Sequence, residues 1–133
     1  QNAHKIKLSG QKNISIVDID PGDSTTVLEL FKKATLFIAP IFGPGGTRLK
    51  ILAAMGSGIP VISTKTGVEG LAVENNKHVI LAETSEDFSI KIAEILSSKN
   101  KYESIRLNAY MLVKEQYNWK KIAQKLETVY QDL

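Results

Sequence analysis

The sequence predicts an α/β fold, a Rossmann-like doubly wound parallel sheet with helices on both of its faces. Short apolar runs alternate with stretches of helical period along the chain, as expected for parallel strands joined by crossover helices. No hairpin signal separates two strands, and glycine-bearing turns follow two of the apolar runs. Because ligands of such folds bind at the carboxyl ends of the strands, we expect the functional site where both glycine-bearing turns emerge.

Length and composition fit one ordinary globular domain spanning residues 1–133. The chain is 43% hydrophobic and 23% charged, and it lacks cysteine, which excludes disulfides and thiolate metal sites. Its two histidines, His4 and His78, are separated by most of the chain, so we expect no metal site. The net charge of +3 is dispersed and few aromatic residues lie among the charges, so we expect no nucleic-acid partner.

The first part of the chain predicts a strand, a helix and a second strand. The apolar run 14–17 is the first strand, and the polar segment 18–23 ends it. Thr26 and Glu29 fit a capping box, so the helix is expected to begin there. The continuous apolar run 36–39 is typical of a strand that is buried on both faces.

A glycine-rich turn then leads into a helix that is expected to start near Thr47. The glycines let the backbone approach a ligand closely, and the helix start offers free N–H groups and a partial positive charge. Two cations in the first turn are unfavourable to the helix dipole, which suggests that an anion offsets them. The pattern favours phosphate binding, with a tight turn that holds no ligand as the alternative. The residues concerned are Gly43, Gly45, Gly46, Thr47, Arg48 and Lys50.

The rest of the chain continues the alternation of strands and helices. Gly58 and Pro60 stop the central helix, and a second glycine-bearing loop, 64–70, separates two further apolar runs. We expect His78 to lie on a turn and Trp119 to anchor the last helix in the core. The expected strands are 61–63 and 79–82, and the expected helices open at 84–87 and carry Ile105 and Ile122.

Taken as an ordered set, these motifs resemble a known family. The segments PIFGPGGTRLKILAAM (40–55), GIPVIST (58–64) and GVEGL (67–71) come in order, with Tyr117-Asn118-Trp119 late in the chain. They are similar to the nucleotide-sugar-binding, C-terminal domain of GT-B fold, group 1 (family 4-like) retaining glycosyltransferases. These enzymes make bacterial capsule, lipopolysaccharide and related glycans. The resemblance covers about residues 10–131.

The resemblance implies a hexosyltransferase that works only as a longer protein. It implies that the acceptor-binding domain and the first part of the donor domain are absent, so the chain alone is expected to be inactive. The donor is expected to be a UDP- or GDP-sugar acting as substrate, with no cofactor and no metal. No general base or nucleophile is visible, so we assign no catalytic residue.

Two positions depart from the family pattern. Ala53 stands where relatives carry a glutamate that holds the donor's ribose, and Gly45 stands where many carry a second glutamate. Losing a charged hydrogen bond of roughly 1.5–3 kcal/mol would weaken donor binding by more than tenfold. Glu69 is the acid best placed by sequence to replace them, or it is a solvated loop residue. Asp18 matches the segment that receives the base in relatives.

The two cations of the central helix are not expected to contact the same phosphate group. Arg48 and Lys50 lie about 200° apart around a helix, because each residue turns about 100°. Lys50 shares a face with Ala53 and is expected on the donor side. Arg48 either contacts the phosphates or forms a structural ion pair.

Two functions remain open from the sequence. In the first, the chain is the donor-binding half of a glycosyltransferase acting on a glycan or lipid-linked acceptor, cytoplasmic and peripheral at the inner face of the membrane. In the second, it is a non-catalytic α/β domain that serves assembly or partner contact. An exposed sheet edge would also allow copies of the chain to pair.

Overall fold

A parallel three-stranded sheet forms the centre of the described structure. The computed structural model describes residues 13–15, 17, 19–20, 22–43 and 48–118. The strand order is β1-β2-β3, with both pairs parallel. The strands are β1 (Phe37–Ala39), β2 (Val61–Ser63) and β3 (Ile80–Leu81). The helices are α1 (Ser24–Lys33), α2 (Leu49–Gly56), the 3-10 turn η2 (Thr66–Val68), α3 (Ser85–Ser97) and α4 (Lys99–Gln116).

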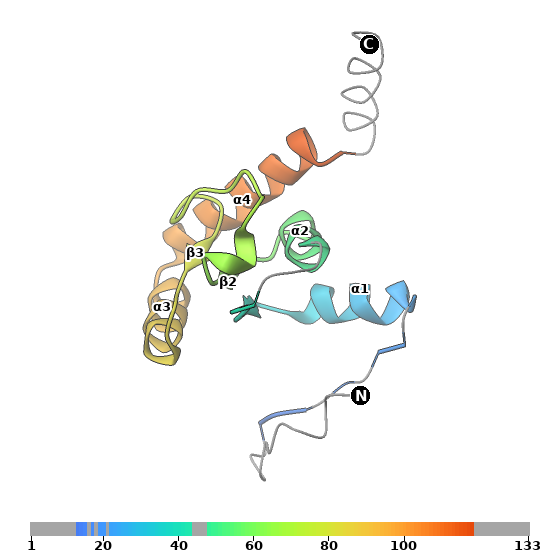
Figure 1. Cartoon of the computed structure of the whole chain (residues 1–133), viewed down its shortest axis with the longest axis horizontal. Coiled ribbons are helices and arrows are strands. Elements are labelled where there is room, and N and C mark those ends of the chain that lie inside the picture. The colour runs from blue at the N-terminus through green and yellow to red at the C-terminus, as the bar shows by residue number, and fades with distance from the viewer. Residues whose placement is uncertain (1–12, 16, 18, 21, 44–47, 119–133) are drawn as a thin grey trace, which may run out of the picture.

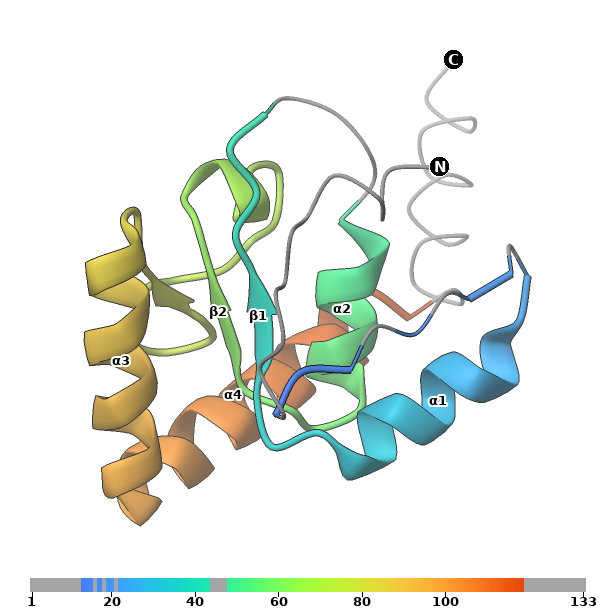
Figure 2. The same cartoon turned by 90° about the horizontal axis from the view of Figure 1, so that it is seen from below.

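Helices cover both faces of this sheet, as the alternation of elements predicts (Figures 1 and 2). One buried cluster joins the sheet to α1, α2 and α4, and it includes Phe31, Met55 and Leu112. A second cluster joins the sheet to α3 and the first half of α4, and it includes Ile62, Ile95 and Ile105. The predicted doubly wound α/β fold is therefore confirmed.

Strand β2 lies at the middle of the sheet and is buried on both faces. Successive side chains of a strand point to opposite faces, so Val61 joins the first cluster and Ile62 the second. Strand β1 differs from the expectation for 36–39, because Ile38 is 44% exposed. Its side chain lies on the α3 side of the sheet, and α3 packs on β2 rather than on β1.

The start of the chain departs from the sequence prediction. Within segment 14–17, the described residues Ile14, Ser15 and Val17 are exposed and form no strand. Ile16 lies outside the described residues. An apolar run becomes a strand only where a neighbouring strand supplies hydrogen bonds, and within the described chain β1 pairs with β2 alone.

Helix α1 begins at Ser24, two residues before the predicted start. Its N-cap is Asp23, whose carboxylate accepts a hydrogen bond from the Thr26 backbone N–H at 3.0 Å. The Thr26 hydroxyl also donates to this carboxylate. Thr26 therefore lies inside the first turn, and the predicted Thr26–Glu29 capping box is wrong because the helix already begins at an earlier N-cap, Asp23.

The later elements follow the prediction closely. Gly58 has a φ of +73° just after α2, which is the left-handed geometry that ends many helices. Thr84 caps α3 by accepting from the Asp87 N–H at 3.1 Å. Ile105 lies buried in α4, as expected. The predictions for Trp119 and Ile122 fall outside the described residues.

Candidate functional site

The loops that follow β1 and β2 leave the same end of the sheet (Figure 2). The register pairs Ala39 with Ser63, so the last residues of the two strands lie side by side. The segment after Ala39 leads toward the glycine-rich turn, and the segment after Ser63 leads into η2. The segments that lead into the two glycine-bearing loops thus start side by side at the carboxyl edge, where α/β folds bind ligands.

Two buried hydroxyls join these loops. Ser63 donates from Oγ to the Ala39 carbonyl oxygen at 2.8 Å. Thr64 donates from Oγ1 to the Ile41 carbonyl oxygen and accepts from the Gly67 N–H at 3.0 Å. Both side chains are fully buried. The backbone polar groups at this end of the sheet therefore find partners inside the protein.

Gly67 is a glycine because the backbone packs very closely there. A Cβ on this residue would lie 2.1 Å from the Ser63 Oγ and 3.1 Å from the Thr64 Oγ1. No side chain fits at 2.1 Å without displacing a buried hydroxyl that is already hydrogen-bonded. The second loop thus packs directly on the residues that end β2.

Arg48 joins the start of α2 to the second loop. Its Nη2 donates to the Thr66 carbonyl oxygen at 2.7 Å, and its side chain is partly buried. This contact is a charge-assisted hydrogen bond to a backbone carbonyl. The guanidinium thereby links η2 to the start of α2.

The other cation, Lys50, lies on the outside of α2. Lys50 and Ala53 are both exposed and three residues apart, so they share one face of the helix, as the sequence predicts. Arg48 is the N-cap residue of α2, and its side chain makes no capping hydrogen bond to the first turn. An anion at this helix start would accept hydrogen bonds from the first N–H groups of α2.

The remaining predicted residues divide into two groups. Gly43 and Glu69 are exposed, Gly43 after β1 and Glu69 at the end of η2. Gly45, Gly46, Thr47 and Asp18 lie outside the described residues. The structure brings Arg48 into contact with η2, and no described contact links Lys50 to Glu69.

Sequence reasoning missed Ser63, Thr64 and Thr66 in this region. The signal available was a pair of hydroxyl residues directly after an apolar strand and before a glycine, which is the pattern of a side chain that caps a following turn. The carbonyl of Thr66 could not be recognised, because every residue carries one.

The described residues contain no group of three or more potential metal ligands. His78 lies on a turn, as expected, and its Nδ1 accepts from the Glu74 N–H at 3.1 Å. Burial, followed by the nearby Lys77 ammonium, lowers the pKa of His78 and favours its neutral form. No helix in the described part of the chain has both the length and the hydropathy of a membrane span.

One solved structure is similar to this chain across most of its length. It is the C-terminal domain of a glycosyl transferase group 1 family protein (LpcC) from Francisella tularensis, with a TM-score of 0.64 and 24% identity. The match covers 80% of this chain and 53% of that domain. This likeness supports the fold, a C-terminal domain of GT-B type.

Two curated proteins are similar in sequence. An uncharacterized 44.6 kDa protein in the cps region of Klebsiella pneumoniae is 29% identical over 87 residues, which is 65% of this chain and 22% of that protein. A probable sucrose-phosphate synthase from Thermosipho melanesiensis is 34% identical over 77 residues, 58% of this chain and 18% of that protein. The matches therefore span about a fifth of each relative's length.

The family is shown by a match that covers most of the chain. Residues 5–98 match the family described as glycosyl transferases group 1, and this segment holds both glycine-bearing loops and all three described strands. The chain therefore belongs to the group 1 glycosyl transferases.

Proposed function

We propose that this chain is the donor-binding half of a glycosyltransferase that moves a sugar from a nucleoside-diphosphate sugar to a glycan or lipid-linked acceptor. The observation that carries the proposal is the pair of loops joined at the carboxyl edge of the sheet. There the start of α2 lies beside η2, and Arg48 links the two. Because the chain belongs to the group 1 glycosyl transferases, we infer that this edge of the sheet takes part in glycosyl transfer.

The chemistry proposed for this edge is stabilisation of the leaving diphosphate. Open N–H groups at a helix start and a nearby ammonium are donors aimed at developing negative charge. Lys50 is the candidate ammonium, because its side chain is exposed at the first turn. Arg48 supports the site indirectly, by holding the second loop in place.

The nucleoside is proposed to lie along the exposed face of α2. Ala53 is exposed there, so a ribose could reach it, yet its methyl group accepts no hydrogen bond. Glu69 is the acid that we propose compensates, because it is exposed on the loop that Arg48 fixes. The donor base would be uracil or guanine, and no cofactor or metal is proposed.

The acceptor site is proposed to lie on another part of a longer protein. Both curated relatives extend far beyond the matched segment, and an acceptor domain in such a longer protein would close the active site. One relative lies in a cps region, which supports a cell-envelope glycan as product. We propose a cytoplasmic enzyme at the inner membrane surface, inactive as this chain alone.

The test is calorimetric titration of the chain with UDP and GDP, repeated with Ala53→Glu. We expect weak binding that strengthens roughly tenfold or more with the glutamate, because a carboxylate can accept from a ribose diol. Lys50→Ala is expected to weaken binding. Lys114→Ala is the matched control, because Lys114 lies in the last turn of α4.

Failure of binding in every form would contradict the donor role. If neither nucleotide bound the chain or the Ala53→Glu variant at millimolar concentration, the alternative of a non-catalytic domain for assembly or partner contact would be favoured. Equal losses in Lys50→Ala and Lys114→Ala would point to general electrostatic attraction instead of a site at α2.

A further inference from the structure

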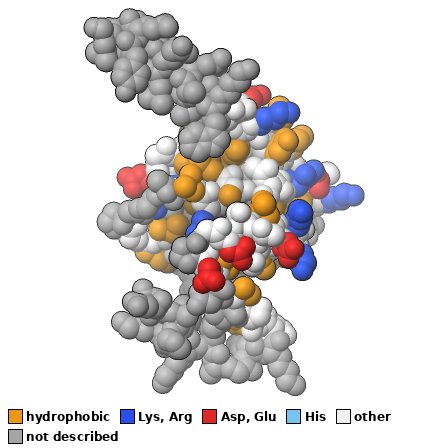
Figure 3. Space-filling view, turned by 90° about the vertical axis from the view of Figure 1, so that its right-hand side faces the viewer, with side chains coloured by type: hydrophobic (Ala, Val, Ile, Leu, Met, Phe, Trp, Pro, Cys, Tyr) orange, Lys and Arg blue, Asp and Glu red, His pale blue; other side chains and the backbone are white. Residues whose placement is uncertain are grey.

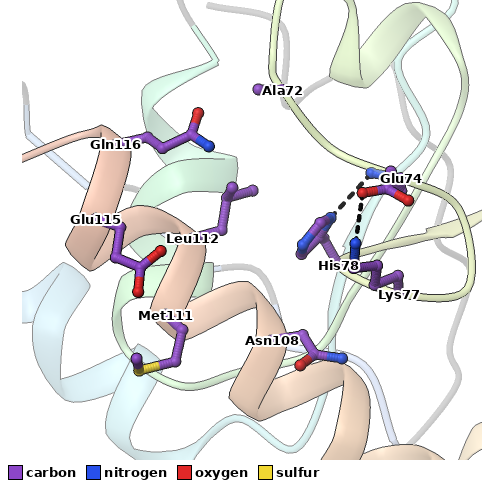
Figure 4. Close-up of a pocket in the computed structure, with 9 residues that line it drawn as sticks. All are labelled: Ala72, Glu74, Lys77, His78, Asn108, Met111, Leu112, Glu115 and Gln116. Carbon is purple, nitrogen blue, oxygen red and sulfur yellow. Dashed lines mark hydrogen bonds and ion pairs between the residues drawn. The ribbon is translucent and has the colours of Figure 1, made fainter.

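A cavity of about 300 Å³ lies between the segment 72–78 and α4 (Figure 4). Its volume is at the lower end of the range for small-molecule sites, about 300–1,000 Å³. None of the residues proposed for the donor site lines it. The lining residues are Ala72, Glu74, Lys77, His78, Asn108, Met111, Leu112, Glu115 and Gln116.

The wall opposite α4 is held in place by internal hydrogen bonds. The Ala72 N–H donates to the Tyr117 hydroxyl oxygen at 2.9 Å, which ties this segment to the end of α4. The Glu74 N–H donates to the Nδ1 of His78, which closes the turn. The cavity is therefore built between two connected parts of the fold.

His78 presents a hydrogen-bond donor to this cavity. Its side chain is more than nine-tenths buried, and its Nδ1 accepts from Glu74. A neutral imidazole that accepts through Nδ1 carries its proton on Nε2. Within the described chain Nε2 has no hydrogen-bond partner, and Figure 4 shows the ring reaching toward the side of α4.

The charges around the cavity disfavour simple ions. Glu74 pairs with Lys77 at 2.7 Å, whereas Glu115 forms no ion pair within the described chain. The excess negative charge disfavours an anion, and the Nε2–H of His78 disfavours a cation. A hydroxyl group can accept from the imidazole and donate to the carboxylate, so a ligand with several hydroxyls satisfies both.

We propose that this cavity binds a neutral sugar ring, one unit of a carbohydrate, at a site separate from the donor site. His78 donates to one ring hydroxyl and Glu115 accepts from another. The amides of Asn108 and Gln116 can each donate and accept, and they reach from α4 (Figure 4). Met111 and Leu112 offer apolar surface to the C–H groups of the ring. This proposal does not rest on the donor role.

The experiment is an NMR titration of the full chain with methyl α-D-glucopyranoside, methyl α-D-galactopyranoside and methyl α-D-mannopyranoside. We expect at least one glycoside to shift the imidazole resonances of His78 and the methyl resonance of Met111, with saturation at millimolar concentration. Inorganic phosphate should leave these resonances unchanged. Because the glycosides carry no phosphate, the result is independent of UDP or GDP binding.

Matched variants decide whether the carboxylate takes part. Glu115→Ala is expected to weaken glycoside binding roughly tenfold, because a charged acceptor is lost. Glu103→Ala, on the same helix but outside the cavity, should bind as the unchanged chain does. The proposal is overturned if no glycoside shifts either resonance, if shifts occur only around Gly43 and Lys50, or if the two variants bind equally.

Discussion

The residues that shape the candidate site are small, and their role is to bring two backbones together. The hydroxyls of Ser63 and Thr64 donate to carbonyls at the end of β1 and just after it, and Gly67 packs against both side chains. Arg48 adds one long contact between α2 and η2. A buried backbone group without a partner costs about 1–3 kcal/mol, so these short side chains stabilise the loops that carry the proposed function.

Gly67→Ala is expected to destabilise the protein. The new Cβ would lie 2.1 Å from the Ser63 Oγ, so the hydroxyl would have to move and lose its bond to Ala39. We expect a loss of about 1–3 kcal/mol in the free energy of unfolding, as for other overpacked sites. Urea denaturation followed by circular dichroism measures this loss.

Gly43→Ala is the matched control for that change. A Cβ on Gly43 would meet nothing within 4 Å. The two variants make the same chemical change, so any difference between them reports the space around each glycine. Equal stability of the two variants would contradict the close packing at Gly67.

At the scale of the element, side-chain caps at the helix starts and a few tertiary contacts stabilise the helices and turns. Asp23 caps α1 and Thr84 caps α3, both through side-chain acceptors for N–H groups of the first turn. Glu94 of α3 accepts from Lys101 of α4 at 3.3 Å, and its hydrogen bonds to Lys91 and Lys101 lower its pKa. The turn before β3 is held by His78 instead, through Nδ1.

This turn is expected to make stability depend on pH. Burial and the Lys77 ammonium lower the pKa of His78 below its ordinary value of 6.5, whereas Glu74 opposes them. The unfolded chain therefore takes up a proton at a higher pH than the folded protein. The stability that neutral His78 contributes to the folded protein is fully present above pH 6.5. It is lost as the pH falls through the lowered pKa.

Urea unfolding at a series of pH values, in the unchanged chain and in His78→Gln, measures this effect. We expect the unchanged chain to lose more free energy of unfolding than the variant between about pH 7 and pH 5. The two proteins differ only at position 78, so the difference between their profiles isolates His78. Parallel pH profiles for the chain and His78→Gln would refute the assignment.

At the scale of the whole molecule, the β1 edge of the sheet, like the β3 edge, has no strand partner within the described chain. β1 pairs with β2 only, and Ile38 at its centre is 44% exposed. Other large apolar side chains are also exposed, and Figure 3 shows hydrophobic side chains in several separate places on the face it presents. Open strand edges with apolar side chains favour association between chains.

We expect the chain of 133 residues to associate with itself through this edge. Sedimentation equilibrium should show an average mass that rises with concentration. Ile38→Lys should reduce the association, because a buried ammonium at a strand edge is costly. Ile90→Lys is the control, since Ile90 is 49% exposed on α3, away from β1. A monomer at every concentration, or equal effects of both variants, would contradict pairing through β1.

Much of this protein is determined by local sequence. The alternation of apolar runs and helical stretches predicts a parallel α/β sheet, because side-chain periodicity follows from backbone geometry alone. Strand 61–63, the helix stop at Gly58 and the cap at Thr84 are all found as predicted. The ordered motifs around both glycine-bearing loops identify the family, which the match over residues 5–98 confirms.

Only the tertiary structure decides which local patterns prevail. The apolar segment 14–17 forms no strand among its described residues, because strand formation depends on a partner that local sequence does not reveal. The contact of Arg48 with the Thr66 carbonyl joins residues 18 apart, and a backbone acceptor leaves no trace in the sequence. The cavity beside His78 likewise depends on how α4 packs against a distant turn. Such contacts are set by the folded geometry, and local periodicity carries no information about them.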